Sequence, residues 1–166
     1  MIFKEQAMNI RAASVIVVGV DGTPAGKAAL EFALREGAAR GSAVEVVTVW
    51  NWVGFGGQLV GPESPSQARE HAQSQQDQAV AEVLDQVSDP PVISRQIVEG
   101  DPAKALLRAA RGADYLVVGS AHKGVVKRTL LGSVSEYCVR HAKCPVVVIP
   151  VSEQLVTDIT PAQQAG

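Results

Sequence analysis

Aromatic residues are scarce in this chain: Phe, Trp and Tyr together make up 4% of its 166 residues. The interior must therefore be filled mainly by Val, Ala, Leu and Ile. Cysteine is nearly absent as well, because only Cys138 and Cys144 occur. Two cysteines so close together argue against a disulfide framework or a metal site, and we interpret both as ordinary packing residues.

A strong charge of one sign is also missing. Lysine and arginine number 15 against 17 aspartate and glutamate residues, so the formal net charge at pH 7 is -2. Binding to nucleic acid through phosphate neutralisation has little support, and we expect no nucleic-acid partner. No stretch approaches the run of about 20 apolar residues that a membrane-spanning helix needs, and the amino terminus lacks the apolar segment of a signal peptide. We expect a cytoplasmic protein with no membrane partner.

The length of the chain suits one domain with a real core. Residues 14–150 carry regular hydrophobic patterns, whereas residues 1–13 and 151–166 carry none. We therefore expect a single domain over 14–150, with a flexible extension before it and a flexible tail after it.

Short Val and Ile runs alternate with longer Ala and Leu stretches of helical spacing, which is typical of an α/β protein. The runs at 14–20 and 115–118 are continuously apolar and are predicted to be buried parallel strands. Further strands are predicted at 44–49 and 146–149. The segment 92–98 alternates more and is predicted to be an edge strand.

Capping signals mark the predicted helix starts. Thr23 before Pro24 and Asp101 before Pro102 each supply an N-cap followed by a first-turn proline. Ser133 and Glu136 have the spacing of a capping box at the start of the last helix. A helix at 66–87 is expected to turn a glutamine-rich face to solvent, because its apolar positions keep helical spacing: Ala68, Ala72, Ala79, Val83 and Val87.

Ligands of open α/β sheets bind outside the carboxyl ends of the strands. Asp21 follows the first strand and Val49 ends the second, so both are candidates. The loop after the fourth strand has the stronger chemistry, because Gly119 permits close backbone approach while Gly132 and Ser133 place amides and a hydroxyl at a helix amino terminus. Such a helix start suits a polyphosphate. Nearby positive charge comes from Lys123, Lys127 and Arg128.

Three segments together resemble the universal stress protein family over about residues 14–150: VIVVGVDGTPAGKAALEFAL, VVGSAHKG and LLGSVSEYCVRHAKCPVVVIP. The phosphate loop of ATP-binding members reads G-x2-G-x9-G-[ST]. Gly119, Gly132 and Ser133 stand at its first and closing positions. His122 replaces the second glycine of the motif.

The resemblance implies an open, Rossmann-like sheet of five parallel strands in the order 3-2-1-4-5, with helices on both faces. It also implies binding of ATP or another adenine nucleotide, with Mg²⁺ held through Asp21 where the metal accompanies the nucleotide. A homodimer through the last strand, Val146–Ile149, is expected too. The site residues expected on these grounds are Val20, Asp21, Val49, Gly119, Ser120, His122, Lys123, Gly124, Gly132, Ser133, Val134 and Ser135.

Several of these candidate residues, and the aromatic residues after the second strand, also have simpler structural explanations. Asp21 would serve equally well in the turn before the first helix, Ser133 as an N-cap, and Trp50, Trp52 and Phe55 as cover for the sheet. The sequence contains neither a Walker P-loop nor a G-x-G-x-x-G fingerprint, and no catalytic constellation emerges from its spacing. We therefore favour a nucleotide-binding regulatory protein. A dimeric scaffold without nucleotide and a slow ATP hydrolase remain alternatives.

Overall fold

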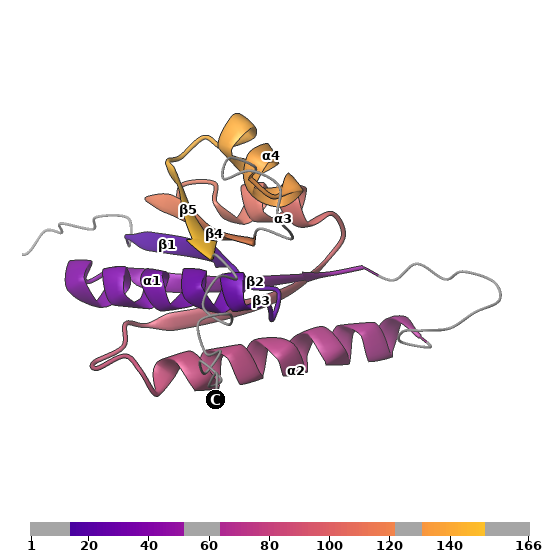
Figure 1. Cartoon of the computed structure of the whole chain (residues 1–166), viewed down its shortest axis with the longest axis horizontal. Coiled ribbons are helices and arrows are strands. Elements are labelled where there is room, and N and C mark those ends of the chain that lie inside the picture. Colours follow the sequence, from indigo (N-terminus) through magenta and orange to yellow (C-terminus); the bar gives the residue numbers. More distant parts are fainter. Residues whose placement is uncertain (1–13, 52–63, 122–130, 152–166) are drawn as a thin grey trace, which may run out of the picture.

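The computed structural model describes residues 14–51, 64–121 and 131–151, in which strands and helices alternate (Figure 1). The strands are β1 (Val15–Gly19), β2 (Ala43–Trp50), β3 (Ile93–Glu99), β4 (Tyr115–Ala121) and β5 (Val146–Val151). The helices are α1 (Pro24–Arg40), α2 (Pro65–Leu84), α3 (Pro102–Ala109) and α4 (Ser133–His141). None of these helices is both long and apolar enough to cross a membrane.

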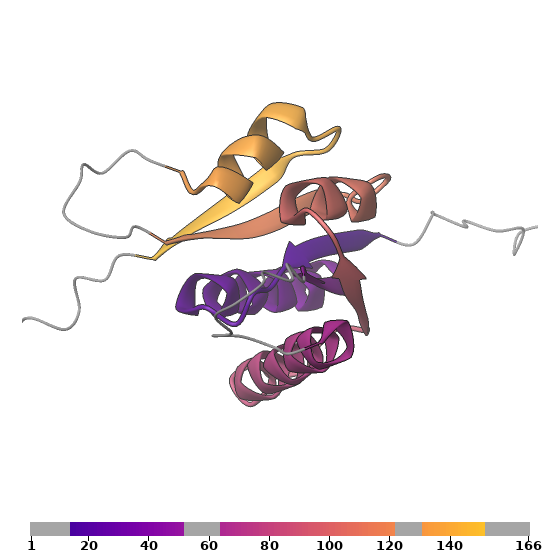
Figure 2. The same ribbon diagram turned by 90° about the vertical axis from the view of Figure 1, so that its right-hand side faces the viewer.

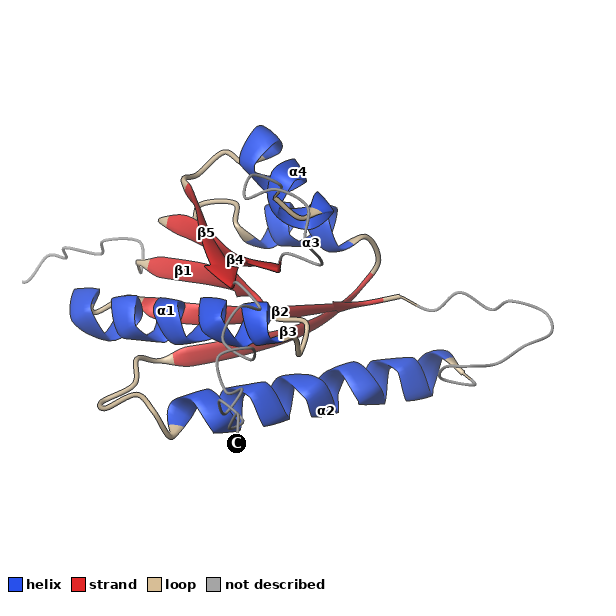
Figure 3. Cartoon of the chain, in the orientation of Figure 1, coloured by secondary structure: helices blue, strands red, loops and turns tan. Residues whose placement is uncertain are grey.

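All five strands are parallel and lie in the order β3-β2-β1-β4-β5, which confirms the predicted topology. β1 is the central strand, and its Val18 lies opposite Val46 of β2 and Val117 of β4. The strand is apolar throughout because helices cover both of its faces. Figure 3 shows the sheet between the two helical layers.

Alternate residues of the strands serve two separate cores. Ile16 and Val18 of β1 pack with α1 and α2, whereas Val17 between them packs on the other face with α3. Figure 2 shows the same division, with α1 and α2 on one side of the sheet and α3 and α4 on the other. The period of two along a strand thus sends side chains from one short apolar run into both cores.

The helix starts follow the predicted caps in α1 and α3. The Thr23 side chain accepts a hydrogen bond from the Gly26 amide, and Asp101 accepts one from the Lys104 amide. The second helix is slightly displaced from its predicted span, since it starts at Pro65 and ends at Leu84. β3 is an edge strand with mostly exposed or half-buried side chains, as its alternation predicted.

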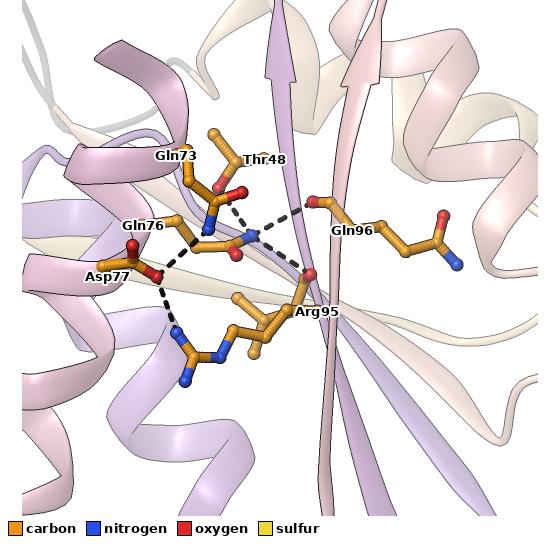
Figure 4. A network of polar contacts seen from close by, with 7 residues as sticks. Thr48, Gln73, Gln76, Asp77, Arg95 and Gln96 are labelled. Atoms are coloured by element: carbon orange, nitrogen blue, oxygen red, sulfur yellow. Dashed lines mark hydrogen bonds and ion pairs between the residues drawn. The ribbon is translucent and has the colours of Figure 1, made fainter. Parts of the chain in front are cut away.

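One glutamine of α2 contradicts the expected solvent face, because Gln76 is fully buried against the sheet. Its Nε2 donates to the carbonyl of Val46 at 3.3 Å, to Thr48 Oγ1 at 3.1 Å and to the carbonyl of Gln96 at 3.1 Å (Figure 4). Thr48 Oγ1 in turn donates to the carbonyl of Val20 at 2.8 Å. A chain of hydrogen bonds therefore joins α2, β3 and β2 to the end of β1.

The buried amide gives a test of this arrangement. Gln76→Glu replaces a donor that faces three acceptors with a carboxylate, and we expect a loss of at least about 3 kcal/mol at neutral pH. Gln76→Leu loses the same hydrogen bonds but buries no charge, and it should cost less, about 1–2 kcal/mol. Urea unfolding of both variants and the parent measures the difference.

The loss of stability caused by Gln76→Glu should also depend on pH. The introduced carboxyl ionises in the unfolded chain with a pKa of about 4.3, whereas burial among acceptors raises its pKa in the folded state. As the pH rises, the carboxyl ionises first in the unfolded state, and this ionisation stabilises that state. The loss in free energy of unfolding relative to the parent therefore grows as the pH rises from about 4 toward 7. Equal stabilities of the two variants at neutral pH would contradict the buried contact.

Candidate functional site

A cavity of about 500 Å³ opens at the carboxyl edge of the sheet, where β1 and β4 lie side by side. The chain leaves β1 for α1 on one face and leaves β4 for α4 on the other, so the winding direction reverses between these strands. Such a reversal is where open α/β sheets hold their ligands, and the volume is within the range of small-molecule sites.

One wall of the cavity is apolar. Val47 and Val49 of β2 meet Pro102 and Leu106 of α3 there. Leu106 packs directly over Gly19, since a Cβ at that glycine would stand 2.9 Å from Leu106 Cδ1. This wall is suited to a flat apolar or aromatic group of a ligand.

The opposite wall is the start of α4, and here the capping prediction was wrong. Gly132, not Ser133, is the N-cap, and no side chain caps the helix. The amides of the first turn therefore have no intrahelical acceptor, and the residues that carry them, Ser133, Val134 and Ser135, line the cavity. Among the described residues, a Cβ at Gly132 would have only Ser135 Oγ near it, at 3.7 Å.

Two buried serines hold the start of α4 in place. Ser120 Oγ accepts a hydrogen bond from the Gly132 amide at 3.3 Å, and Ser135 Oγ donates to the Gly132 carbonyl at 2.9 Å. Both side chains are almost completely buried. They tie the end of β4 to the first turn of α4 and so fix where its free amides point.

Asp21 closes the third side. Its Oδ1 accepts hydrogen bonds from the Thr23 amide at 3.1 Å and from Thr23 Oγ1 at 2.5 Å. Between them Gly22 has a φ of +76°, a conformation that other residues rarely adopt. The other carboxylate oxygen, Oδ2, has no partner among the described residues. Asp21 therefore orders the turn with one oxygen and presents the second to the cavity region.

Gly119 was expected to let a ligand approach the backbone, and in the structure it lets the first turn of α1 approach instead. A Cβ at Gly119 would lie 2.3 Å from the carbonyl oxygen of Ala25, so the β4 backbone is pressed against the first turn of α1. The glycine permits the approach of a helix, and both Gly119 and Ala25 line the cavity. The backbones of β4 and α1 thus meet closely at the cavity.

The structure brings most of the predicted site residues together. Those that line the cavity are Val20, Asp21, Val49, Gly119, Ser120, Gly132, Ser133, Val134 and Ser135. His122, Lys123, Gly124, Lys127 and Arg128, together with Trp52 and Phe55, lie outside the described residues. Trp50 is described and does not line the cavity.

Sequence reasoning missed the wall supplied by α3 and the turn of α1. The lining residues that it did not name are Gly19, Thr23, Ala25, Gly26, Val47, Pro102, Leu106 and Val118. A signal for α3 was present, because the Asp101-Pro102 cap places the start of that helix at the same carboxyl edge.

Thiol chemistry is disfavoured near the site. Cys138 lies on the buried face of α4, and burial, with a smaller effect of Asp101, raises the pKa of its thiol to about 11. Burial also raises the pKa of Cys144. Both thiols are therefore protonated at neutral pH and poor nucleophiles. The described residues contain no cluster of His, Cys, Asp and Glu side chains able to hold a metal by themselves.

The two motif glycines should respond differently to a methyl group. Gly119→Ala forces the backbone of α1 away from β4, and we expect it to lower the free energy of unfolding by about 2–3 kcal/mol. Gly132→Ala meets no close contact among the described residues, at a negative φ of -63°, and should change that energy by less than about 1 kcal/mol. Chemical denaturation measures both, and similar losses would contradict the backbone contact at Gly119.

A model of the universal stress protein family matches residues 13–150. Among curated proteins, a universal stress protein of Mycobacterium tuberculosis is 34% identical over 137 residues, a match that covers 80% of this chain and 44% of the relative. The chain spans a little under half the length of the curated relatives that it matches.

Solved structures share the fold. A protein of the universal stress protein family from Burkholderia pseudomallei has 30% identity and a TM-score of 0.62, with 85% of this chain and 98% of that chain covered. A universal stress protein in complex with cAMP has 23% identity and a TM-score of 0.60 over 83% and 97% of the two chains. A family member from Arabidopsis thaliana with AMP bound has 24% identity and a TM-score of 0.53 over 82% and 91%. Since the family model covers most of the chain, this protein belongs to the universal stress protein family.

Proposed function

We propose that this protein binds an adenine nucleotide, with ATP as the leading candidate, in the cavity between β1 and β4. The observation that carries the proposal is the pairing of two unlike walls across one cavity. An apolar wall stands on one side and the uncapped start of α4 on the other. A nucleotide has the same division, with an aromatic base at one end and anionic phosphates at the other.

The apolar wall suits the base. Val49, Leu106 and Pro102 offer aliphatic surface against which a purine ring buries its faces. Burial of apolar area stabilises a complex by about 25 cal/mol per Å². The proposal does not require stacking on an aromatic side chain, because no described aromatic residue lines the cavity.

The start of α4 suits the phosphates. Backbone amides without intrahelical acceptors, at the positive end of the helix dipole, favour an anion. Ser133 adds an exposed hydroxyl, and Gly132 has no side chain of its own to keep an anion from the amides. Asp21 then holds the sugar or, through its free Oδ2, a Mg²⁺ ion that accompanies the phosphates.

Relatives support the choice of ligand. The similar folds solved with cAMP and with AMP are themselves universal stress proteins, so members of this family hold adenine nucleotides. ATP as the ligand rests on the spacing of Gly119, Gly132 and Ser133. His122, which replaces a glycine of that motif, favours a second candidate, a dimeric scaffold whose cavity no longer holds a nucleotide.

Binding, not turnover, is the proposed activity, because Asp21 is the one carboxylate among the described cavity-lining residues. General acid–base chemistry commonly needs a second titratable group beside it. We place this regulatory role in the cytoplasm, where the unpaired thiols of Cys138 and Cys144 persist.

Titration calorimetry tests the proposal. ATP, AMP and cAMP should each be tried on the parent protein, and at least one should bind. Gly132→Asp places a carboxylate beside the amides of α4, so we expect it to weaken nucleotide binding about ten-fold or more. Gly132→Ala is the matched control, since it adds a Cβ without charge, and it should retain most of the affinity.

Two results would decide against parts of the proposal. Equal affinities of Gly132→Asp and the parent would exclude the start of α4 as the phosphate site. No binding of any of the three nucleotides, together with no adenine nucleotide in the mass spectrum of acid-denatured protein, would favour the scaffold. Phosphate release above that of the Gly132→Asp variant would indicate a slow hydrolase.

We also propose that two copies associate through β5. This strand is the last in the sheet and pairs only with β4, which leaves one row of its backbone groups for another partner. The side chains of Val146–Ile149 are only half-buried in one copy. Exposed apolar edge strands promote association, and pairing with a second copy is one way to cover them.

Sedimentation equilibrium should find a dimer at micromolar concentration. Hydrogen exchange at Val146–Ile149 should then slow as the protein concentration rises, because the outer edge of β5 becomes paired. A monomer at micromolar concentration, or a dimer in which exchange at these residues is unchanged by dilution, would contradict this interface.

A further inference from the structure

A second hollow, of about 360 Å³, lies between α3 and α4, which contact one another on one face of the sheet (Figure 2). It shares no lining residue with the cavity described above. Apart from Leu107, every lining residue carries a basic side chain: Lys104, Arg108, Arg111, His141 and Lys143. We call this hollow the α3–α4 groove.

Lysines and arginines outside the groove are mostly ion-paired. The pairs are Lys27 with Glu82, Arg35 with Glu31, Arg40 with Glu36, Arg95 with Asp77 and Arg140 with Glu136. Within the described ranges, no carboxylate lies at ion-pair distance from the lysines and arginines of the groove. Arg69 of α2 is the sole other described lysine or arginine without an ion pair. Uncompensated positive charge is therefore concentrated at one place.

Four carboxylates on the neighbouring elements each have another partner. Asp101 caps α3, with its Oδ1 2.9 Å from the Lys104 amide, and Glu136 pairs with Arg140 at 2.8 Å. Glu45 of β2 accepts a hydrogen bond from Gln96, and Asp114 accepts one from Ser14. None of these groups lies at ion-pair distance from a lysine or arginine of the groove, although Glu45 lines a neighbouring hollow together with Arg108.

Helix electrostatics explain only part of the cluster. Cations near the last turn of a helix interact favourably with its dipole, which accounts for Arg108 in the last turn of α3, Arg111 just after it, His141 at the end of α4 and Lys143 just beyond it. Lys104 lies in the first turn of α3, at the positive end of the dipole. It also precedes Arg108 by four residues, where two like charges repel each other. The position of Lys104 therefore costs stability unless an anion binds there.

We propose that the α3–α4 groove binds a compact anion carrying two or more phosphate groups. Lys104 and Arg108 lie about 6 Å apart along one face of α3, Arg111 follows two residues after the end of that helix, and Lys143 lines the groove from beyond α4, so the cations are spread over more than one phosphate can span. Guanidinium groups pair with phosphate oxygens in a bidentate manner, and exposed Lys104 and Lys143 add further positive charge.

A compact anion fits better than a long polyanion. The formal net charge of the chain is -2, and most described cations outside the groove are matched by carboxylates. A nucleic-acid strand that extended beyond the groove would therefore meet a surface with no excess of positive charge. The volume of the groove is also within the range of small-molecule sites.

Inorganic tripolyphosphate is the probe for this proposal, titrated by calorimetry into the full chain at low salt. Gly132→Asp is used as the background, so that the start of α4 contributes little. We expect binding that weakens as salt rises, and a loss of about ten-fold or more in affinity for the double variant Arg108→Gln and Arg111→Gln. The matched control is Arg35→Gln with Arg40→Gln, two arginines paired with glutamates on α1, and it should bind as the background protein does.

Lys104→Glu separates a binding role from a structural one. An acidic residue in the first turn, four residues before Arg108, should raise the melting temperature while weakening tripolyphosphate binding about ten-fold. The proposal is overturned if tripolyphosphate fails to bind, if the α3 and α1 double variants bind equally, or if Lys104→Glu retains full affinity. Tighter binding of a single-stranded oligonucleotide than of tripolyphosphate would likewise overturn the assignment to a compact anion.

Discussion

The contact between the β4 backbone at Gly119 and the first turn of α1 is the constraint on which the site depends. With only 2.3 Å between a virtual Cβ and the Ala25 carbonyl oxygen, no other residue fits without moving the helix. Gly26 allows a second close approach, since a Cβ there would lie 2.6 Å from Asp21 Oδ1. Together these contacts press the start of α1 onto the edge of the sheet. These contacts lie at the cavity, which residues of α3 and of the first turn of α4 also line.

The buried amide of Gln76 supports the same region from α2. Its hydrogen bond to Thr48 Oγ1 continues to the carbonyl of Val20, the residue before Asp21. The neighbouring Gln75 lies against Gly22 in the turn, 3.4 Å from a virtual Cβ there. Two successive glutamines of one helix thus support the segment that carries Asp21: Gln76 acts through Thr48 in the interior, and Gln75 lies against Gly22. A buried, directional contact of this kind fixes the position of α2 along the sheet more narrowly than apolar packing does.

Features that depend on local chemistry were predictable from the sequence, and those that depend on distant partners were not. The caps at Thr23 and Asp101 follow from side chains acting within three residues. The alternating patterns indicated an α/β fold, and the resemblance to the family supplied the order of the strands. Gln76 was assigned to solvent because its burial requires acceptors from β2 and β3, which only tertiary structure supplies. Ser133 matched a local capping pattern, but Ser120 and Ser135 hold Gly132 in the N-cap position instead. For the same reason, the apolar wall of α3 and the groove beyond it could not be read from spacing alone.

α3 contributes to both the cavity and the groove, although it is only eight residues long. Leu106 points toward the sheet and the cavity, whereas Lys104 and Arg108, two residues away on either side, point to the groove. A rotation of about 100° per residue places these sets on nearly opposite sides of the helix. The cavity and the groove also differ in how strongly salt screens their attraction for an anion. Attraction by fixed backbone amides at a partly enclosed cavity is weakly screened, whereas attraction by exposed side-chain cations falls within a Debye length of about 8 Å at physiological salt. Ionic strength therefore acts mainly on the groove and leaves the cavity largely unaffected.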